Sequence, residues 1–162
     1  VNEVLLPDAQ QGMFVTIFYA VLDLETGELQ YANAGHNPPL LVHHASGEID
    51  LLERGGMALG VLEGIHIEER PVKIDPGDYL VLYTDGLTEA FAPNGRMYEI
   101  DGLLQTLRSA QTGAIPGDAR DETSAPVAGG IELSAAELLN GIEADLLGGA
   151  PAGIHGRETP PR

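Results

Sequence analysis

The residues best suited to chemistry follow an apolar segment in the middle of the chain. Thr84–Glu89 reads TDGLTE and begins where the apolar run Tyr79–Thr84 ends. A carboxylate such as Asp85 at a strand end is well placed to meet a hard cation such as Mg²⁺ or Mn²⁺, and Gly86 permits a sharp turn beside it. The alternative is that Asp85 caps a short helix by accepting backbone N–H bonds. The spacing alone leaves both interpretations open.

A second candidate is the segment 33–39, which reads NAGHNPP. Gly35 permits an unusual backbone angle, and the two prolines at its end stiffen the exit. His36 and Asn37 could therefore present hydrogen-bond donors to an anionic substrate. The alternative is a rigid turn whose polar side chains satisfy backbone groups.

Other familiar chemistries are excluded by what the chain lacks. It contains no cysteine, so disulfides, thiolate zinc sites and cysteine nucleophiles are ruled out. His43 and His44 are adjacent on an expected strand, so they face opposite sides and cannot share one metal. No HExxH motif, phosphate-binding loop or GxSxG elbow is present.

The charge balance restricts the partners. The chain carries 25 acidic and 8 basic residues, for a formal charge of −17. Nucleic acid and anionic membranes are therefore poor partners, because both demand clustered Lys and Arg. No apolar run approaches the length of about 20 residues that spans a bilayer. The lack of cysteine fits a cytoplasmic location.

Short strands joined by tight turns are expected over most of the first half of the chain. Segment 13–24 is nearly continuously apolar, which indicates a strand buried on both faces. In segment 75–78, Pro and Gly occupy the central positions that a type II turn favours. The pattern predicts an antiparallel meander whose strands are 13–24, 28–33, 40–44, 48–52, 66–74 and 79–84.

Helices are expected at the start and in the second half of the chain. Residues 1–6 read as a helix end that Pro7 and Asp8 terminate. Apolar spacing predicts helices in 99–108 and 134–147, the second opened by a Ser134–Glu137 capping box. The result is an α+β fold divided into a domain segment, a flexible insert, a helix of the same domain and a disordered tail: 1–108, 109–130, 131–147 and 148–162. One face of the apolar strands has no expected cover, which indicates missing structure.

Several motifs occur in an order that resembles one protein family. They are MFVT at 13–16, GELQYANAGHNPP at 27–39, GMALG at 56–60, and PGD at 76–78 followed by YLVLYTDGLTEA at 79–90. Together they resemble the SpoIIE/RsbU branch of the metal-dependent (PPM-type) protein phosphatases. The resemblance covers about residues 1–108, and the helix at 134–147 fits its continuation.

The resemblance implies an αββα sandwich with Mn²⁺ or Mg²⁺ ions held mainly by aspartates. The ions would activate a water that attacks a phosphoserine or phosphothreonine. Asp85 matches the metal-ligating aspartate of the family's TDG motif, and Gly86 matches the glycine beside it. His36 and Asn37 match a signature of this branch without an assigned catalytic role. The partner that the resemblance implies is a phosphorylated anti-anti-sigma (STAS-like) protein, with sensor domains upstream in the same protein. Apart from the resemblance, apolar surface left uncovered in this chain could lead to a homodimer.

Departures from the family pattern predict an incomplete site. The Asp-Val-x-Gly segment would precede Val1, and the terminal Asp-Asp-x-Thr strand would follow the helix at 134–147; neither is present. Asp118 and Asp121 lie in the expected insert, a poor setting for preorganised ligands. We therefore expect a weakly active or inactive fragment of a longer protein phosphatase. The alternative is a non-catalytic phosphatase-like module that binds a regulator.

Overall fold

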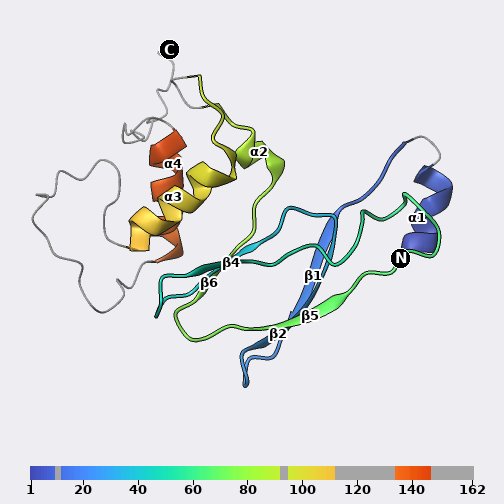
Figure 1. Cartoon of the computed structure of the whole chain (residues 1–162), viewed down its shortest axis with the longest axis horizontal. Helices are drawn as coiled ribbons and strands as arrows, with labels where there is room; N and C mark the ends of the chain where they lie inside the picture. Colours follow the sequence, from blue (N-terminus) through green and yellow to red (C-terminus); the bar gives the residue numbers. More distant parts are fainter. Residues whose placement is uncertain (10–11, 92–94, 112–133, 147–162) are drawn as a thin grey trace, which may run out of the picture. The chain divides into compact units, whose positions relative to one another are not determined.

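The computed structural model describes residues 1–9, 12–91, 95–111 and 134–146 (Figure 1). The chain divides into two compact units, residues 1–85 and 86–162. The first unit contains two antiparallel sheets of three strands each. One has the order β1 (Ile17–Leu22), β2 (Glu28–Ala34), β5 (Glu69–Lys73), and the other has the order β4 (Ile49–Leu51), β3 (Leu40–Val42), β6 (Tyr79–Val81).

The two sheets pack face to face around an apolar core. Leu29 and Tyr31 of β2 are buried against Leu41 of β3 and Leu52, which follows β4. Phe18 of β1 stacks on Tyr31 with a ring-centroid distance of 5.4 Å. Alternate residues of β2 point inward because side chains alternate across a strand. The α+β class is confirmed, and the packed sheets supply the ββ layers of the expected sandwich.

The strand order differs from one continuous meander. The β1–β2 and β3–β4 hairpins are confirmed, and every strand pair is antiparallel. However, β5 returns to pair with β2, and β6 returns to pair with β3. The chain thus changes sheet after β2, after β4 and after β5. Alternation of apolar and polar residues along the sequence predicts where strands form. Which sheet each strand joins depends instead on how the apolar faces of the two sheets are buried against each other.

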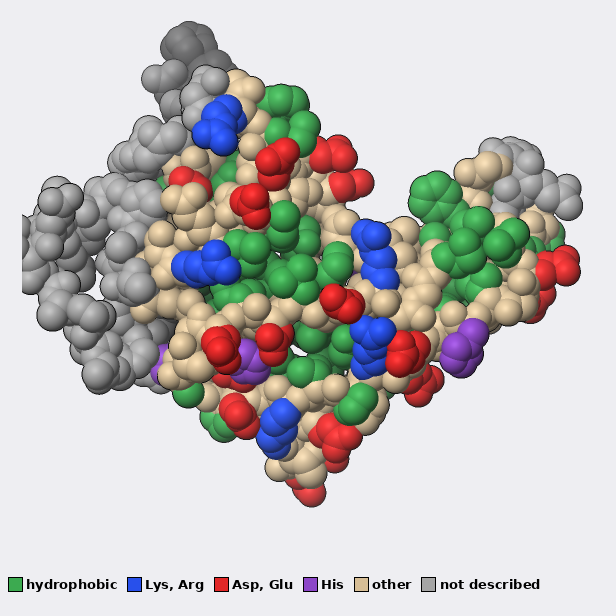
Figure 2. Space-filling view, viewed as in Figure 1, with side chains coloured by type: hydrophobic (Ala, Val, Ile, Leu, Met, Phe, Trp, Pro, Cys, Tyr) green, Lys and Arg blue, Asp and Glu red, His purple; other side chains and the backbone are tan. Residues whose placement is uncertain are grey.

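Burial of β1 on both faces was a wrong expectation. Phe18 and Ala20 face the core, whereas Ile17, Tyr19 and Val21 are 40%, 62% and 55% exposed. The reason is that only one face of this sheet packs on the core, while the side chains on the other face of β1 remain exposed among the described residues. Hydrophobic side chains also gather on the surface around the first helix (Figure 2). Val4 of that helix and Leu62, whose carbonyl accepts from Asn2, are exposed hydrophobic residues.

The first helix is longer than expected. Helix α1 (Asn2–Ala9) continues through Pro7, where the sequence pattern predicted a break. Its first turn is anchored, because the Asn2 amide donates to the Leu62 carbonyl at 2.9 Å and accepts from the Gly60 N–H at 2.8 Å. These bonds attach α1 to the loop that follows β4.

The second unit is built on a helix pair. Helix α2 (Asp85–Thr88) straddles the boundary, and α3 (Glu99–Gln111) packs on α4 (Ala135–Leu146). The buried Thr106 hydroxyl forms a hydrogen bond with the Tyr98 hydroxyl at 2.7 Å and donates to the Asp145 carboxylate at 2.8 Å. Burial raises the pKa of Tyr98. None of the described helices is long and apolar enough to span a bilayer.

The predicted helices of this unit are confirmed with shifted ends. The Ser134–Glu137 capping box forms, with the carboxylate of Glu137 accepting the Ser134 N–H at 2.7 Å. This bond lowers the pKa of Glu137. Helix α3 runs to Gln111, into the segment predicted as an insert. The rest of that insert, with Asp118 and Asp121, and the tail 148–162 lie outside the described residues.

Candidate functional site

The strand register brings four separate loops to one end of the sheets. Leu40 at the start of β3 pairs with Leu51 at the end of β4 and with Val81 at the end of β6. In the other sheet, Ile17 at the start of β1 pairs with Ala34 at the end of β2. We call this the open end; the loops that leave it include Thr16, the turn 35–39, the segment 52–56 and residues 82–85.

The 33–39 turn is organised by a buried amide. The Asn33 side chain is 0% exposed, and its oxygen accepts the backbone N–H of His36 at 2.9 Å. Its amide nitrogen donates to the Leu52 carbonyl at 3.3 Å, and its backbone carbonyl accepts the Gly55 N–H at 3.0 Å. The turn is therefore bound to the segment after β4. One of the two alternatives for segment 33–39 was a rigid turn whose polar side chains form hydrogen bonds with backbone groups. Asn33 has that role, because its side chain bonds to the backbone of His36 and Leu52.

Gly35 has the unusual backbone angle that the sequence predicted. Its φ is 74°, and a Cβ there would lie 2.8 Å from the Ala58 backbone nitrogen. This close approach seats the GMALG segment (56–60) beside the turn, with a bridge between Ala34 and Gly56. Glycine is required here both for its left-handed conformation and for the space.

His36 connects three parts of the open end. Its backbone N–H is held by Asn33, and its ring Nδ1 lies 3.2 Å from the Thr16 hydroxyl. Its carbonyl accepts a hydrogen bond from Arg54 Nε at 3.1 Å. Asn37, the other polar residue predicted here, is half-buried. The ring of His36 is thus positioned by contacts to Thr16 and through its own backbone.

Arg54 also acts on the residues that lead to Asp85. Burial raises the pKa of the Tyr83 hydroxyl, and the positive charge of Arg54 opposes that shift. Tyr83 lies two residues before Asp85 on the segment that leaves β6. Arg54 is therefore close to the exit of β6 as well as to His36.

Asp85 is exposed and is the first residue of α2. Gly86 is the second residue of that helix and is not among the glycines with positive φ, so its backbone conformation does not require glycine. Among the described residues, no group of three or more His, Cys, Asp or Glu side chains could hold a metal ion. The described residues alone therefore do not fit the family's Mn²⁺ or Mg²⁺ centre, and Asp85 supplies at most one ligand to it.

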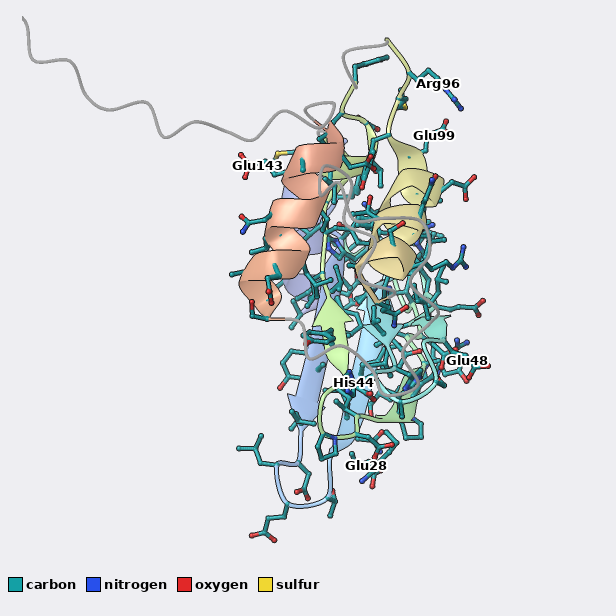
Figure 3. The ribbon with its side chains drawn as sticks, turned by 90° about the vertical axis from the view of Figure 1, so that its left-hand side faces the viewer. Glu28, His44, Glu48, Arg96, Glu99 and Glu143 are labelled. Atoms are coloured by element: carbon teal, nitrogen blue, oxygen red, sulfur yellow. The ribbon has the colours of Figure 1, made fainter. Side chains whose placement is uncertain are left out.

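The opposite end of the sheets, which we call the hairpin end, carries the other prominent polar cluster. His43 Nδ1 lies 3.1 Å from Asp78 and its Nε2 lies 3.1 Å from Asp50. The neighbouring His44 instead lies against Gly77, as expected for adjacent residues that face opposite sides. Figure 3 shows His44 and Glu48 with Glu28 at this lower end of the strands.

Asp78 of the PGD motif is a turn residue. Its carboxylate is 3% exposed and accepts the backbone N–H groups of His44 at 2.9 Å and Asp75 at 3.0 Å. Burial by itself would raise the pKa of Asp78. The two backbone hydrogen bonds and the contact with His43 outweigh burial, so the pKa of Asp78 is lowered. The hydrogen bond to Asp50 raises the pKa of His43, with Asp78 adding to it against the effect of burial. Asp78 therefore stabilises the hairpin end and does not belong to the open end.

Three residues of the open end were not predicted as site residues. Thr16 and Asn33 both lie inside segments that the family resemblance covers, so their position in those motifs was the available signal. Arg54 lies outside every motif. Its one sequence signal is that it is a basic residue in a strongly acidic chain.

Comparison with known proteins identifies one family. Residues 1–129 match the family model described as Stage II sporulation protein E (SpoIIE). Protein IcfG of Synechocystis is 37% identical over 96 residues, which cover 59% of this chain and 15% of that protein. Phosphoserine phosphatase RsbU of Bacillus subtilis is 31% identical over 94 residues, which cover 58% of this chain and 28% of that protein. The chain thus spans less than a third of the length of these relatives.

Two solved structures are similar in part. The RsbU and RsbW domains of Rv1364c from Mycobacterium tuberculosis match with 31% identity and a TM-score of 0.47, over 68% of this chain and 33% of that one. The phosphatase domain of SpoIIE from Bacillus subtilis (Mn presoaked) matches with 14% identity and a TM-score of 0.42, over 58% of this chain and 40% of that one.

Proposed function

The chain belongs to the SpoIIE family of PPM-type phosphatase domains, and from that premise we propose that it forms part of a protein serine/threonine phosphatase. The open end is the proposed active-site end. The observation that carries the proposal is the register between Leu40 and Val81, from which the His36 turn and Asp85 extend in the same direction. His36, Asn37, Gly86 and Asp85 are the proposed site residues.

The proposed substrate is a phosphoserine or phosphothreonine on a regulatory protein of the anti-anti-sigma type. Support comes from relatives whose names describe them as phosphoserine phosphatases, RsbU and RsbP of Bacillus subtilis. Mn²⁺ or Mg²⁺ would supply a nucleophilic hydroxide near neutral pH and offset the charge of the phosphoryl oxygens. Asp85 would hold one such ion. The proposal includes a cytoplasmic location, which the family's regulatory role supports.

We also propose that this chain alone is weakly active or inactive. The described residues offer no group of three ligands, and Mg²⁺ does not give up its water readily to a single carboxylate. Little Mn²⁺-dependent hydrolysis of a phosphoserine protein by the 162-residue chain is expected. Rapid hydrolysis that Asp85→Asn abolishes would show a complete site and contradict this part of the proposal.

The role of Asp85 itself is tested in a longer protein that carries this segment. Asp85→Asn should abolish Mn²⁺-dependent phosphoserine hydrolysis, because the amide cannot supply the anionic ligand. Asp75→Asn is the matched control, since Asp75 is an exposed aspartate at the hairpin end. Equal activity in the two variants would remove Asp85 from the proposed site.

A second candidate is a non-catalytic module that keeps the phosphatase fold to bind a regulator. The lack of a three-ligand cluster among the described residues favours it. The two candidates differ in one measurement. Binding of a phosphoserine protein by the longer protein, without Mn²⁺- or Mg²⁺-dependent hydrolysis, supports the module.

A further inference from the structure

Arg54 differs from the other basic side chains of the first unit. Among the described residues, Arg70 pairs with Glu68 at 2.7 Å, and Lys73 donates to a backbone carbonyl. Arg54 has no carboxylate partner in that part of the chain, and its Nε donates to the His36 carbonyl at 3.1 Å. This bond fixes the guanidinium through one nitrogen and leaves the two terminal nitrogens for other acceptors.

The ring of His36 is held in the same place. Its Nδ1 lies 3.2 Å from the Thr16 hydroxyl, which can donate to it. In that arrangement the ring proton resides on Nε2, so the ring presents a donor on its other side. The backbone of His36 is fixed in turn by the buried Asn33. The guanidinium of Arg54 is thus bound to the backbone of His36, and the imidazole of the same His36 is held by Thr16.

The anchored pair lies at the end of the sheet from which Asp85 extends. Arg54 follows Leu51 by three residues, His36 precedes Leu40 by four, and Leu40 pairs with Leu51 and with Val81. The positive charge of Arg54 reaches the segment after Val81. The chain carries a formal charge of −17, which disfavours an anionic group, so a local cation favours the binding of such a group.

We propose that Arg54 and His36 form a binding site for the phosphoryl group of the substrate at the open end. The inference rests on the proposed function and adds a residue outside the family motifs to it. The terminal nitrogens of Arg54 suit bidentate bonds to phosphoryl oxygens, which a lysine cannot reproduce. His36 Nε2 supplies a further donor.

The test is a nuclear magnetic resonance titration of the 162-residue chain, first with inorganic phosphate and then with a phosphoserine peptide. Both probes should shift the His36 ring signals and the backbone amides of His36 and Arg54. Arg54→Gln should weaken the binding about tenfold or more, because charged hydrogen bonds are lost. The affinity of Arg54→Lys for phosphate should lie between that of the wild type and that of Arg54→Gln. Arg70→Gln, which removes the same charge from a cation that is already paired, should change little.

Two outcomes would overturn the site. One is equal weakening by Arg54→Gln and Arg70→Gln, which would mean that only net charge matters. The other is a phosphoserine peptide that leaves the His36 and Arg54 signals unchanged, or that shifts them no more than its unphosphorylated form does. Arg54 and His36 are exposed or half-buried, so the variants should fold, and the unperturbed amide spectrum checks this.

The result is separable from that of the proposed function. Phosphate binding that Arg54→Gln abolishes, combined with a longer protein that shows no Mn²⁺- or Mg²⁺-dependent phosphoserine hydrolysis, supports the binding site and removes the enzymatic role. Phosphoserine hydrolysis by the longer protein with a KM unchanged by Arg54→Gln supports the enzymatic role and overturns the binding site.

Discussion

The Asn33 side-chain oxygen accepts the backbone N–H of His36 at 2.9 Å, inside a site where Asn33 is fully buried. Asn33→Ala should lower the free energy of unfolding by about 1–3 kcal/mol, because it leaves the His36 N–H and the Leu52 carbonyl without that partner. Asn37→Ala is the control, since Asn37 makes no hydrogen bond within the described residues; a change within about 0.5 kcal/mol is expected. Chemical denaturation measures both, and equal losses would contradict the role of Asn33.

Gly35→Ala should destabilise the protein more than Gly64→Ala. Both glycines have positive φ, 74° and 63°, so each substitution carries a backbone cost of about 1 kcal/mol. A Cβ at Gly35 would also lie 2.8 Å from the Ala58 nitrogen, whereas nothing lies within 4 Å of one at Gly64. The difference in denaturation midpoint between the two variants therefore reports the steric clash between the new Cβ at position 35 and the backbone of Ala58. Matching midpoints would show that the GMALG segment moves away without cost.

Stability should fall as the pH rises above 6.5, the ordinary pKa of a histidine, and His43 should account for part of that fall. Asp50 and Asp78 raise the pKa of His43 in the folded state, so protonation favours folding. The contribution is complete below pH 6.5 and is lost as the pH passes through the raised value. The nearby charged groups are Asp75 and Glu48 from the adjoining turns, with His44 beside it.

The measurement is the free energy of unfolding across that pH range for the wild-type chain and for His43→Gln. The variant should show a shallower decline, since glutamine does not titrate. His66→Gln is the control, because His66 is an exposed histidine at a distance in the sequence. Parallel curves for the wild type and His43→Gln would contradict the assignment.

Gly102→Ala and Gly141→Ala, both inside helices, should have opposite effects. A Cβ at Gly102 would lie 2.7 Å from the Tyr98 ring, which Thr106 holds by its hydroxyl. Overpacking of about 1–3 kcal/mol should outweigh the gain in helix propensity. At Gly141 the nearest atom is 3.8 Å away, so the gain of up to about 1 kcal/mol should appear. Thermal denaturation of the two variants measures these effects. Stabilisation by both substitutions would show that the Tyr98 ring moves aside at no cost.

Local patterns in the sequence determined the elements of this protein. Alternation and turn residues predicted the hairpins, and the Ser134–Glu137 spacing predicted the helix start that the structure has. The order of the motifs by itself indicates the SpoIIE family, which the family model also matches. These features depend on residues close together in the chain, where backbone preferences and local hydrogen bonds act.

Tertiary structure decided which residues meet. The exchange of strands between two sheets, the exposed face of β1 and the contact between Arg54 and His36 all join distant segments. No local preference encodes them, because they follow from how the two sheets bury their apolar faces. The sequence could identify Asp85 and His36 as candidates, but only the pairing of Leu40 with Val81 brings their loops to one end.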